Sequence, residues 1–253
     1  MIGRSGERPG DLTEPPSTVD PCRLSGLPVI DRLTVARVTR VPEWHPEHGV
    51  FEPFPVHVWV IRHPDGVILV DTGIGEGSDA IDSWYGPEVV ALGNALASVH
   101  LDLGDIAAVV LSHLHFDHCG QQRLLHAPVF VQAVEYGEAQ RPRYTVDEWA
   151  AIPRRRLRLV HGDQEIAEGV HVVATPGHTP GHQSVVIEAR GSRVVLGAQC
   201  AFRAAEMLTG EPADTNLHDE SWRDSARESL ARLRALGPTT VHLSHDAAIV
   251  ELA

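Results

Sequence analysis

The chain has 253 residues, 43% of them hydrophobic, which is enough for one large domain with a complete core. Its formal net charge of −13 argues against nucleic acid or an anionic membrane surface as a partner. The three cysteines, Cys22, Cys119 and Cys200, are too few and too scattered for a disulfide framework, and they fit a reducing cytoplasm.

Residues 1–27 are rich in proline, glycine, serine and charged side chains. This composition predicts a flexible or surface-laid extension, followed by one domain over residues 28–253. No apolar stretch resembles a signal peptide or is long enough to cross a bilayer, so we expect neither.

The domain begins with a β-like pattern. Residues 33–38 alternate between apolar and polar, and the apolar runs 56–61 and 67–70 are separated by a Pro-Asp-Gly turn, which predicts a hairpin ending at Asp71. Residues 88–99 carry apolar side chains at helical spacing, so we expect a helix there.

A buried strand predicted over residues 106–111 leads directly into the sequence His-Leu-His-Phe-Asp-His. In an extended segment, residues two apart point the same way, so the first two histidines can reach one metal ion. Imidazole suits zinc and similar divalent ions, and a carboxylate adds a charged ligand. The candidate ligands here are His113, His115, Asp117 and His118.

Further predicted strands cover residues 129–131, 157–160 and 170–174, and the last of these enters a loop with His178 and His182. Spacing alone allows either histidine to be a ligand. A hairpin over 183–196, an amphipathic helix over 222–236 capped by Asp219 or Ser221, and a strand ending at His245 complete the chain. The order of elements predicts two β-sheets with helices outside and strand ends on one rim.

Together these motifs resemble the metallo-β-lactamase superfamily, whose fold is an α/β, four-layer αβ/βα sandwich. The likeness runs from about residue 56 to the C-terminus, and the branch most similar is the N-acyl homoserine lactonases. The segments that carry it are His113 to His118, Thr175 to Ser184, and Ser244 to Asp246.

The resemblance implies a role for each of these residues. His113, His115 and His178 would hold a first metal ion, and Asp117, His118 and His245 a second. Asp117 would also orient or deprotonate the attacking water. Asp71 would support the metal loops from behind, and His182 would be structural.

Two positions depart from the family pattern. The aspartate expected to bridge the two ions is replaced by Gln199, whose neutral oxygen would be a weak ligand or none. A tyrosine expected near the substrate carbonyl is replaced by Phe202, which has no hydroxyl. Cys200 could take the bridging position if a bulge shifts the strand end, although an inert buried thiol is the simpler expectation. Residues 202–217 could form one wall of the substrate pocket, with Trp84 and Tyr85 contributing.

The implied function is metal-dependent hydrolysis of a lactone, ester or thioester through a metal-activated water, in secondary metabolism or signal degradation. The cofactor would be one or two zinc ions, with iron or manganese left open, and the partner a small-molecule substrate. The alternative is a metal-binding, non-hydrolytic member of the fold that binds a ligand or partner. The sequence does not determine the oligomeric state.

Overall fold

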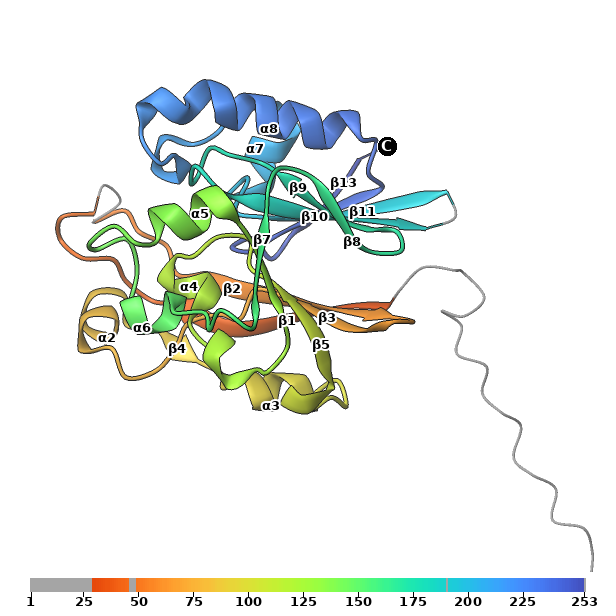
Figure 1. Cartoon of the computed structure of the whole chain (residues 1–253). Coiled ribbons are helices and arrows are strands. Elements are labelled where there is room, and N and C mark those ends of the chain that lie inside the picture. Colours follow the sequence, from red (N-terminus) through yellow and green to blue (C-terminus); the bar gives the residue numbers. More distant parts are fainter. Residues whose placement is uncertain (1–28, 46–48, 190, 253) are drawn as a thin grey trace, which may run out of the picture.

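The computed structural model describes residues 29–45, 49–189 and 191–252. The extension predicted over residues 1–27 lies outside the described residues, as does Cys22. The described chain forms two facing β-sheets with helices on their outer sides (Figure 1). Each helix in these ranges is too short or too polar to cross a membrane.

Within the described residues, the first sheet has seven strands in the order β4-β1-β2-β3-β5-β6-β7, and the second has six in the order β13-β12-β11-β10-β9-β8. The strands of the first sheet are β1 (Val29–Val38), β2 (Phe54–His63), β3 (Gly66–Val70), β4 (Glu88–Val89), β5 (Ile106–Val110), β6 (Val129–Gln132) and β7 (Leu157–Val160). Those of the second are β8 (Gln164–Ala167), β9 (Val170–Ala174), β10 (Gln183–Ala189), β11 (Ser192–Ala198), β12 (Thr240–Leu243) and β13 (Ile249–Glu251).

Alternation along the strands assigns side chains to layers. In β2, Trp59 and Ile61 belong to the cluster between the sheets, whereas Val58 and Val60 belong to the cluster under the first set of helices. A third cluster, which includes Leu230, packs the last long helix against the second sheet. These layers confirm the predicted αβ/βα sandwich.

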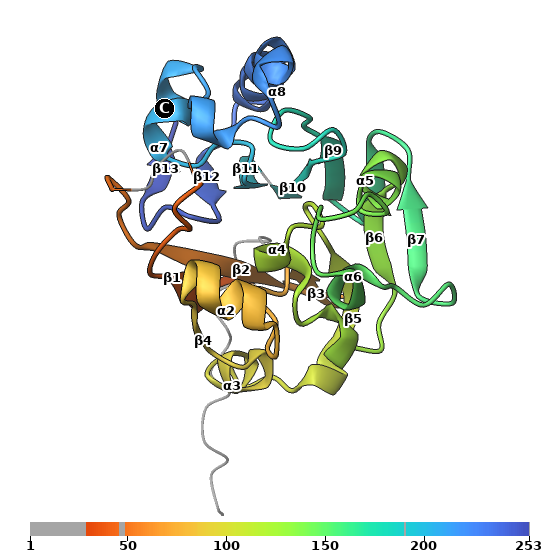
Figure 2. The ribbon, with the colours of Figure 1, turned by 90° about the vertical axis from the view of Figure 1, so that its left-hand side faces the viewer.

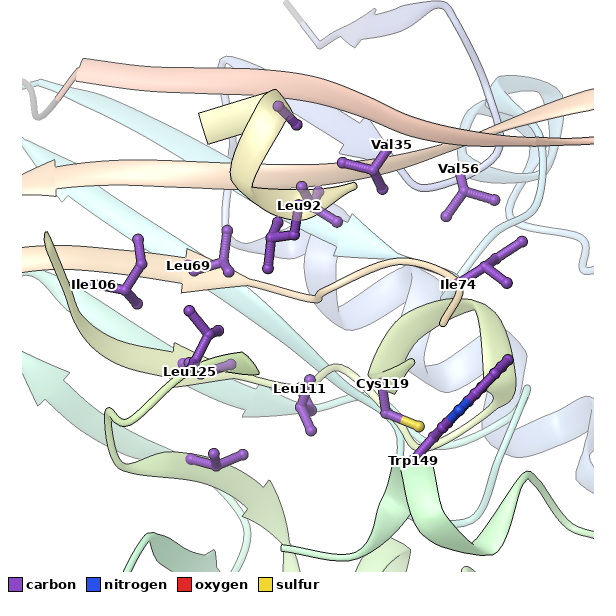
Figure 3. Packing of buried hydrophobic residues seen from close by; sticks show 14 of the residues in the cluster. Val35, Val56, Leu69, Ile74, Leu92, Ile106, Leu111, Cys119, Leu125 and Trp149 are labelled. Atoms are coloured by element: carbon purple, nitrogen blue, oxygen red, sulfur yellow. The ribbon is translucent and has the colours of Figure 1, made fainter. Parts of the chain in front are cut away.

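The outer cluster of the first sheet is shown in Figure 3. Leu92 packs over Val35 of β1, and Trp149 lies beside Cys119. The helices are α2 (Asp79–Tyr85), α3 (Leu92–Ala97), α4 (Phe116–Cys119), α5 (Ala133–Glu138), α6 (Asp147–Ala150), α7 (Ala204–Thr209) and α8 (Arg223–Ala235).

The helix predicted over residues 88–99 was partly wrong. Glu88 and Val89 instead pair with β1 as the edge strand β4, and the helix begins only at Leu92. The free edge of β1 offers unpaired backbone groups, and pairing with them outweighs the local helical spacing. Helix α8 is confirmed over Arg223–Ala235, but Asp219 caps the short 3₁₀ turn before it rather than α8 itself.

The topology brings five strand ends to one edge of the sandwich. Strand β3 is parallel to β5, and β11 is parallel to β12. Strand β9 points the same way as β11, because both are antiparallel to β10. The loops of the two sheets meet on one rim, where His118 Nε2 after β5 lies 3.1 Å from Gln199 Oε1 after β11. Helices α2, α4, α5 and α7 are arranged around this rim (Figure 2).

Candidate metal centre

The loop after β5 is anchored by the buried carboxylate of Asp71, which directly follows β3. Asp71 Oδ1 accepts a hydrogen bond from the Ser112 backbone N–H at 2.7 Å, and Oδ2 accepts one from the Ser112 hydroxyl at 2.8 Å. Asp71 Oδ2 also lies 2.8 Å from His118 Nδ1. A carboxylate facing an imidazole in this way fixes its tautomer and leaves the other ring nitrogen available for a metal.

A second buried carboxylate, Glu135 of α5, holds the two histidine loops together. Its Oε1 accepts from the Leu114 backbone N–H at 2.8 Å and from the Tyr144 hydroxyl at 2.5 Å, and its Oε2 accepts from the Thr179 hydroxyl at 2.7 Å. Burial raises the pKa of Glu135. The loop that carries His115 is therefore clamped to the loop after β9.

His113, His115 and His178 form the first group of ligand-type side chains. One ring nitrogen from each lies within 4.8 Å of the others. His115 Nδ1 is 3.0 Å from His178 Nε2, and His178 Nδ1 faces the Asn216 carbonyl at 3.2 Å. His113 Nε2 is buried and has no hydrogen-bond partner among the described residues.

Asp117, His118 and His245 form the second group, with donor atoms within the same 4.8 Å limit. Asp117 Oδ2 lies 3.5 Å from His118 Nε2 and 3.4 Å from His245 Nε2. Gln199 Oε1 lies 3.1 Å from each of the same two nitrogens. His245 Nδ1 faces the Pro55 carbonyl at 3.1 Å, which directs its Nε2 toward the group.

These separations fit a divalent metal. Four ligands at about 2.0–2.1 Å from a tetrahedral zinc ion lie about 3.3–3.4 Å from one another. The second group shows this spacing, and the first has a buried imidazole nitrogen with nothing to bind. Nitrogen and carboxylate donors are also the types that zinc prefers in proteins.

The electrostatics of the ligand histidines point the same way. Burial holds the pKa of His113 and His178 well below the usual histidine value. Burial also lowers the pKa of His115 and His245 to about 4, although Asp117 acts in the opposite direction. Neutral imidazole is the form that binds metal.

Asp117 and His118 behave differently from these neutral histidines. Burial favours the uncharged form of both, but each stabilises the charge of the other. His118 and His245 hold the pKa of Asp117 below its usual range, while Asp117 and Asp71 raise the pKa of His118 to about 10. The carboxylates of Asp117 and Asp71 therefore favour a positive charge at His118, which a proton supplies here and a bound divalent ion would supply in its place.

The structure shows where Gln199 and Cys200, just after β11, and His182, just before β10, lie relative to the two groups. The register with β12 shifts between Leu196 and Ala198, so a bulge is present, and with it Gln199 faces the second group. Cys200 packs into the core under α8, and burial raises the pKa of its thiol to about 12. His182 belongs to neither group; its Nε2 accepts the Gln199 backbone N–H at 3.2 Å, which positions that residue.

Phe202 lies beside the second group. Its ring centroid is 4.9 Å from that of His245 and 4.9 Å from that of Phe54. At the other end of the predicted wall, Asn216 contacts His178, but Met207 between them is buried in the core of the second sheet. Contacts with ligand histidines are thus found near the two ends of the segment 202–217, where Arg203 also donates to the His245 carbonyl at 3.0 Å.

Several residues that shape the centre were not foreseen from the sequence. Glu135, the Asn216 carbonyl and the Pro55 carbonyl each position a ligand or its loop. Backbone carbonyls carry no side-chain signal, and Glu135 stands in an ordinary helical segment. The one possible sequence signal for Glu135 is a charged side chain within a segment that is otherwise suited to burial.

The chain is similar to known proteins. The family model described as "Metallo-beta-lactamase superfamily" matches residues 51–245. An N-acyl homoserine lactonase of a Bacillus species is 34% identical over 161 residues, which are 58% of this chain and 64% of the relative. The chain thus matches slightly under two thirds of that relative's length. An N-acyl homoserine lactonase of Bacillus thuringiensis is 30% identical over 188 residues, covering 69% of this chain and 70% of the relative.

A solved structure is also similar. It is described as an N-acyl homoserine lactone hydrolase with the product N-hexanoyl-L-homoserine bound at the catalytic metal center. It matches with a TM-score of 0.72 and 25% sequence identity, covering 87% of this chain and 94% of that chain. These matches confirm the resemblance identified from the sequence.

Proposed function

The chain belongs to the metallo-β-lactamase superfamily, and from that premise we propose that it is a metal-dependent hydrolase of a lactone, ester or thioester carbonyl. The observation that carries the proposal is the convergence of six ligand-type side chains in two adjoining groups on one rim. The lactonase relatives make an N-acyl homoserine lactone the first substrate to test.

The ligand assignment remains a prediction. His113, His115 and His178 would hold one ion, and His118, His245 and Asp117 a second, with Gln199 as a weak neighbour. A bound divalent ion, zinc first with iron or manganese open, supplies Lewis acidity and a water whose pKa falls to about 7. Asp117 remains ionised in its surroundings, so it can orient the attacking water and accept its proton.

We propose that the two ions bind with unequal affinity. Two divalent ions about 3.5 Å apart repel by roughly 20 kcal/mol at an effective dielectric constant of about 20. A bridging carboxylate offsets part of that repulsion, but the amide of Gln199 is neutral. Purified protein should therefore contain between one and two ions per chain, nearer one, by elemental analysis. Two tightly held ions would contradict the weak second site.

The test of function is turnover by the metal-replete full chain of homoserine lactones with short and long acyl chains, aryl esters and acyl thioesters. We expect hydrolysis of at least one class, lost after chelation and restored by adding the ion. His113→Ala is the matched control, because it removes a nitrogen with no other partner among the described residues. Metal-free protein after metal-replete expression would disprove the proposal.

The second candidate is a non-hydrolytic binder. The specific observation in its favour is that both departures, Gln199 and Phe202, lie at one strand end beside His245. Tight metal and lactone binding with no turnover of any substrate in the panel would favour this reading. Retention of all five ligand histidines with Asp117 favours the hydrolase, because a binder has no need of the complete set.

The proposed setting is the cytoplasm, with a small-molecule substrate and without a nucleic-acid or membrane partner. The buried thiols of Cys119 and Cys200 are free, which suits a reducing compartment. Signal degradation and secondary metabolism are both compatible with this chemistry, and the substrate panel separates them.

A further inference from the structure

The position from which the resemblance implies a donor to the substrate oxygen is occupied by Phe202. During hydrolysis the carbonyl oxygen gains negative charge, and a hydrogen-bond donor aimed at it lowers the barrier. At the expected position Phe202 offers only an aromatic ring, packed against Phe54 and His245. A donor from another element would act beside the Lewis acidity of the bound ion.

The chain has three tyrosines, and two of them are engaged elsewhere. Tyr144 donates its hydroxyl to Glu135 at 2.5 Å. Tyr136 lines a cavity of about 470 Å³ between α5 and α6, to which none of the ligand-type side chains contributes. This leaves Tyr85, the last residue of α2.

Tyr85 contacts the loop from His113 to His118. Its ring stacks on Phe116, the residue between His115 and Asp117, with ring centroids 4.5 Å apart and planes 29° from parallel. Its backbone carbonyl accepts hydrogen bonds from the N–H groups of Thr39 and Arg40, both at 3.2 Å, so the end of α2 is fixed in place. Within the described part of the chain, the Tyr85 hydroxyl makes no hydrogen bond.

The surroundings keep this hydroxyl a donor. Burial, and then the negative charge of Asp117, raise the pKa of Tyr85 to about 12. The phenol is therefore protonated throughout the neutral range.

We propose that the Tyr85 hydroxyl donates a hydrogen bond to the carbonyl oxygen of the substrate, and so supplies from α2 the donor that Phe202 lacks. The inference rests on the proposed hydrolase function. Water oxygen bonds to the carbonyl carbon as Asp117 takes its proton, then the carbon–oxygen bond of the ester breaks and the proton passes to the leaving oxygen. Tyr85 keeps its own proton throughout.

The geometry also limits the chemical class of the substrate. The acyl carbonyl would lie between the Tyr85 and Phe202 sides of the rim, with aromatic surface from Phe116 and Phe54 on either side. This arrangement suits an uncharged ester or lactone flanked by apolar groups.

The test is Tyr85→Phe in the metal-replete full chain, because this change keeps the ring on Phe116 and removes only the hydroxyl. Loss of one such donor should lower kcat/KM by about 10²–10³-fold, mainly through kcat. Metal content and Tm should stay as in the unaltered protein. Tyr136→Phe is the matched control and should change kcat/KM by less than about twofold.

Three results would overturn the inference. Tyr85→Phe with kcat/KM within twofold of the unaltered protein would show that the hydroxyl is not used, while leaving the hydrolase function intact. Loss of activity together with metal or thermal stability would assign Tyr85 a structural role. Absence of turnover by the unaltered, metal-replete protein on the whole panel would remove the proposed function, and this inference with it.

Discussion

The two ligand groups of the rim are built from different chemistry. The first contains three imidazoles and no carboxylate, and its loops are clamped from outside by Glu135. The second has a carboxylate inside, from Asp117, and another behind it, from Asp71, together with the neutral amide of Gln199. Three imidazoles alone suffice for a catalytic zinc site, whereas a second ion beside the first needs anions to offset repulsion. The second group thus already contains carboxylates, and the charge that is missing is the one between the two ions, where Gln199 is neutral. The lack of this bridging charge should make the second ion the weaker one.

The largest expected effect comes from deleting one histidine in each group. His113→Ala should remove the tightly bound ion, lowering metal affinity by at least about a hundredfold and abolishing hydrolysis. His118→Ala should leave the tight ion in place. Elemental analysis and turnover of the two variants, prepared side by side, measure this. If His118→Ala instead empties the protein of metal, the tight site is the second group, and the comparison is reversed.

The next test removes the charge behind the second group. Asp71→Asn keeps a side chain that tolerates the positive φ of 62° at this position, but it weakens the bonds to Ser112 and His118. We expect a loss of about 1–3 kcal/mol in the free energy of unfolding and about 10–100-fold in affinity for the second ion. Thermal unfolding and metal titration check both. Unchanged metal affinity would show that Asp71 serves only the fold.

A smaller effect is expected from adding charge at the strand end of β11. Gln199→Asp introduces an anion between the groups and should raise affinity for the second ion by roughly tenfold or more. Gln199→Asn is the control, because it has the same length as aspartate without the charge, and it should not raise affinity. If Gln199→Asp takes up the ion but loses activity on the best substrate, Gln199 is an adaptation to chemistry with one ion.

The smallest change is expected at the aromatic side of the second group. Phe202→Tyr adds a hydroxyl beside His245, but Tyr85 would already supply the donor, so kcat/KM should rise by less than about threefold. Steady-state kinetics on the best substrate of the panel measures it. A gain of a hundredfold would show that the substrate oxygen lacks a donor in the unaltered protein, which would contradict the role of Tyr85.

Much of the centre could be predicted because its histidines follow strands that local pattern reveals. The loop from His113 to His118 and the histidines His178 and His245 come directly after apolar or alternating runs, and strand direction then places them on one rim. The departures at Gln199 and Phe202 were visible for the same reason, since their positions count from a recognisable strand.

Only the tertiary structure decided how these loops are held and which neighbours they meet. Glu135 and the Asn216 carbonyl come from segments without any ligand pattern, and their contacts cross large distances in sequence. The bulge in β11 selected Gln199 over Cys200, and the stacking of Tyr85 on Phe116 joined α2 to the metal loop. Sequence pattern reports the local periodicity of each element, whereas the packing of one element against another depends on shape and burial that no single segment encodes.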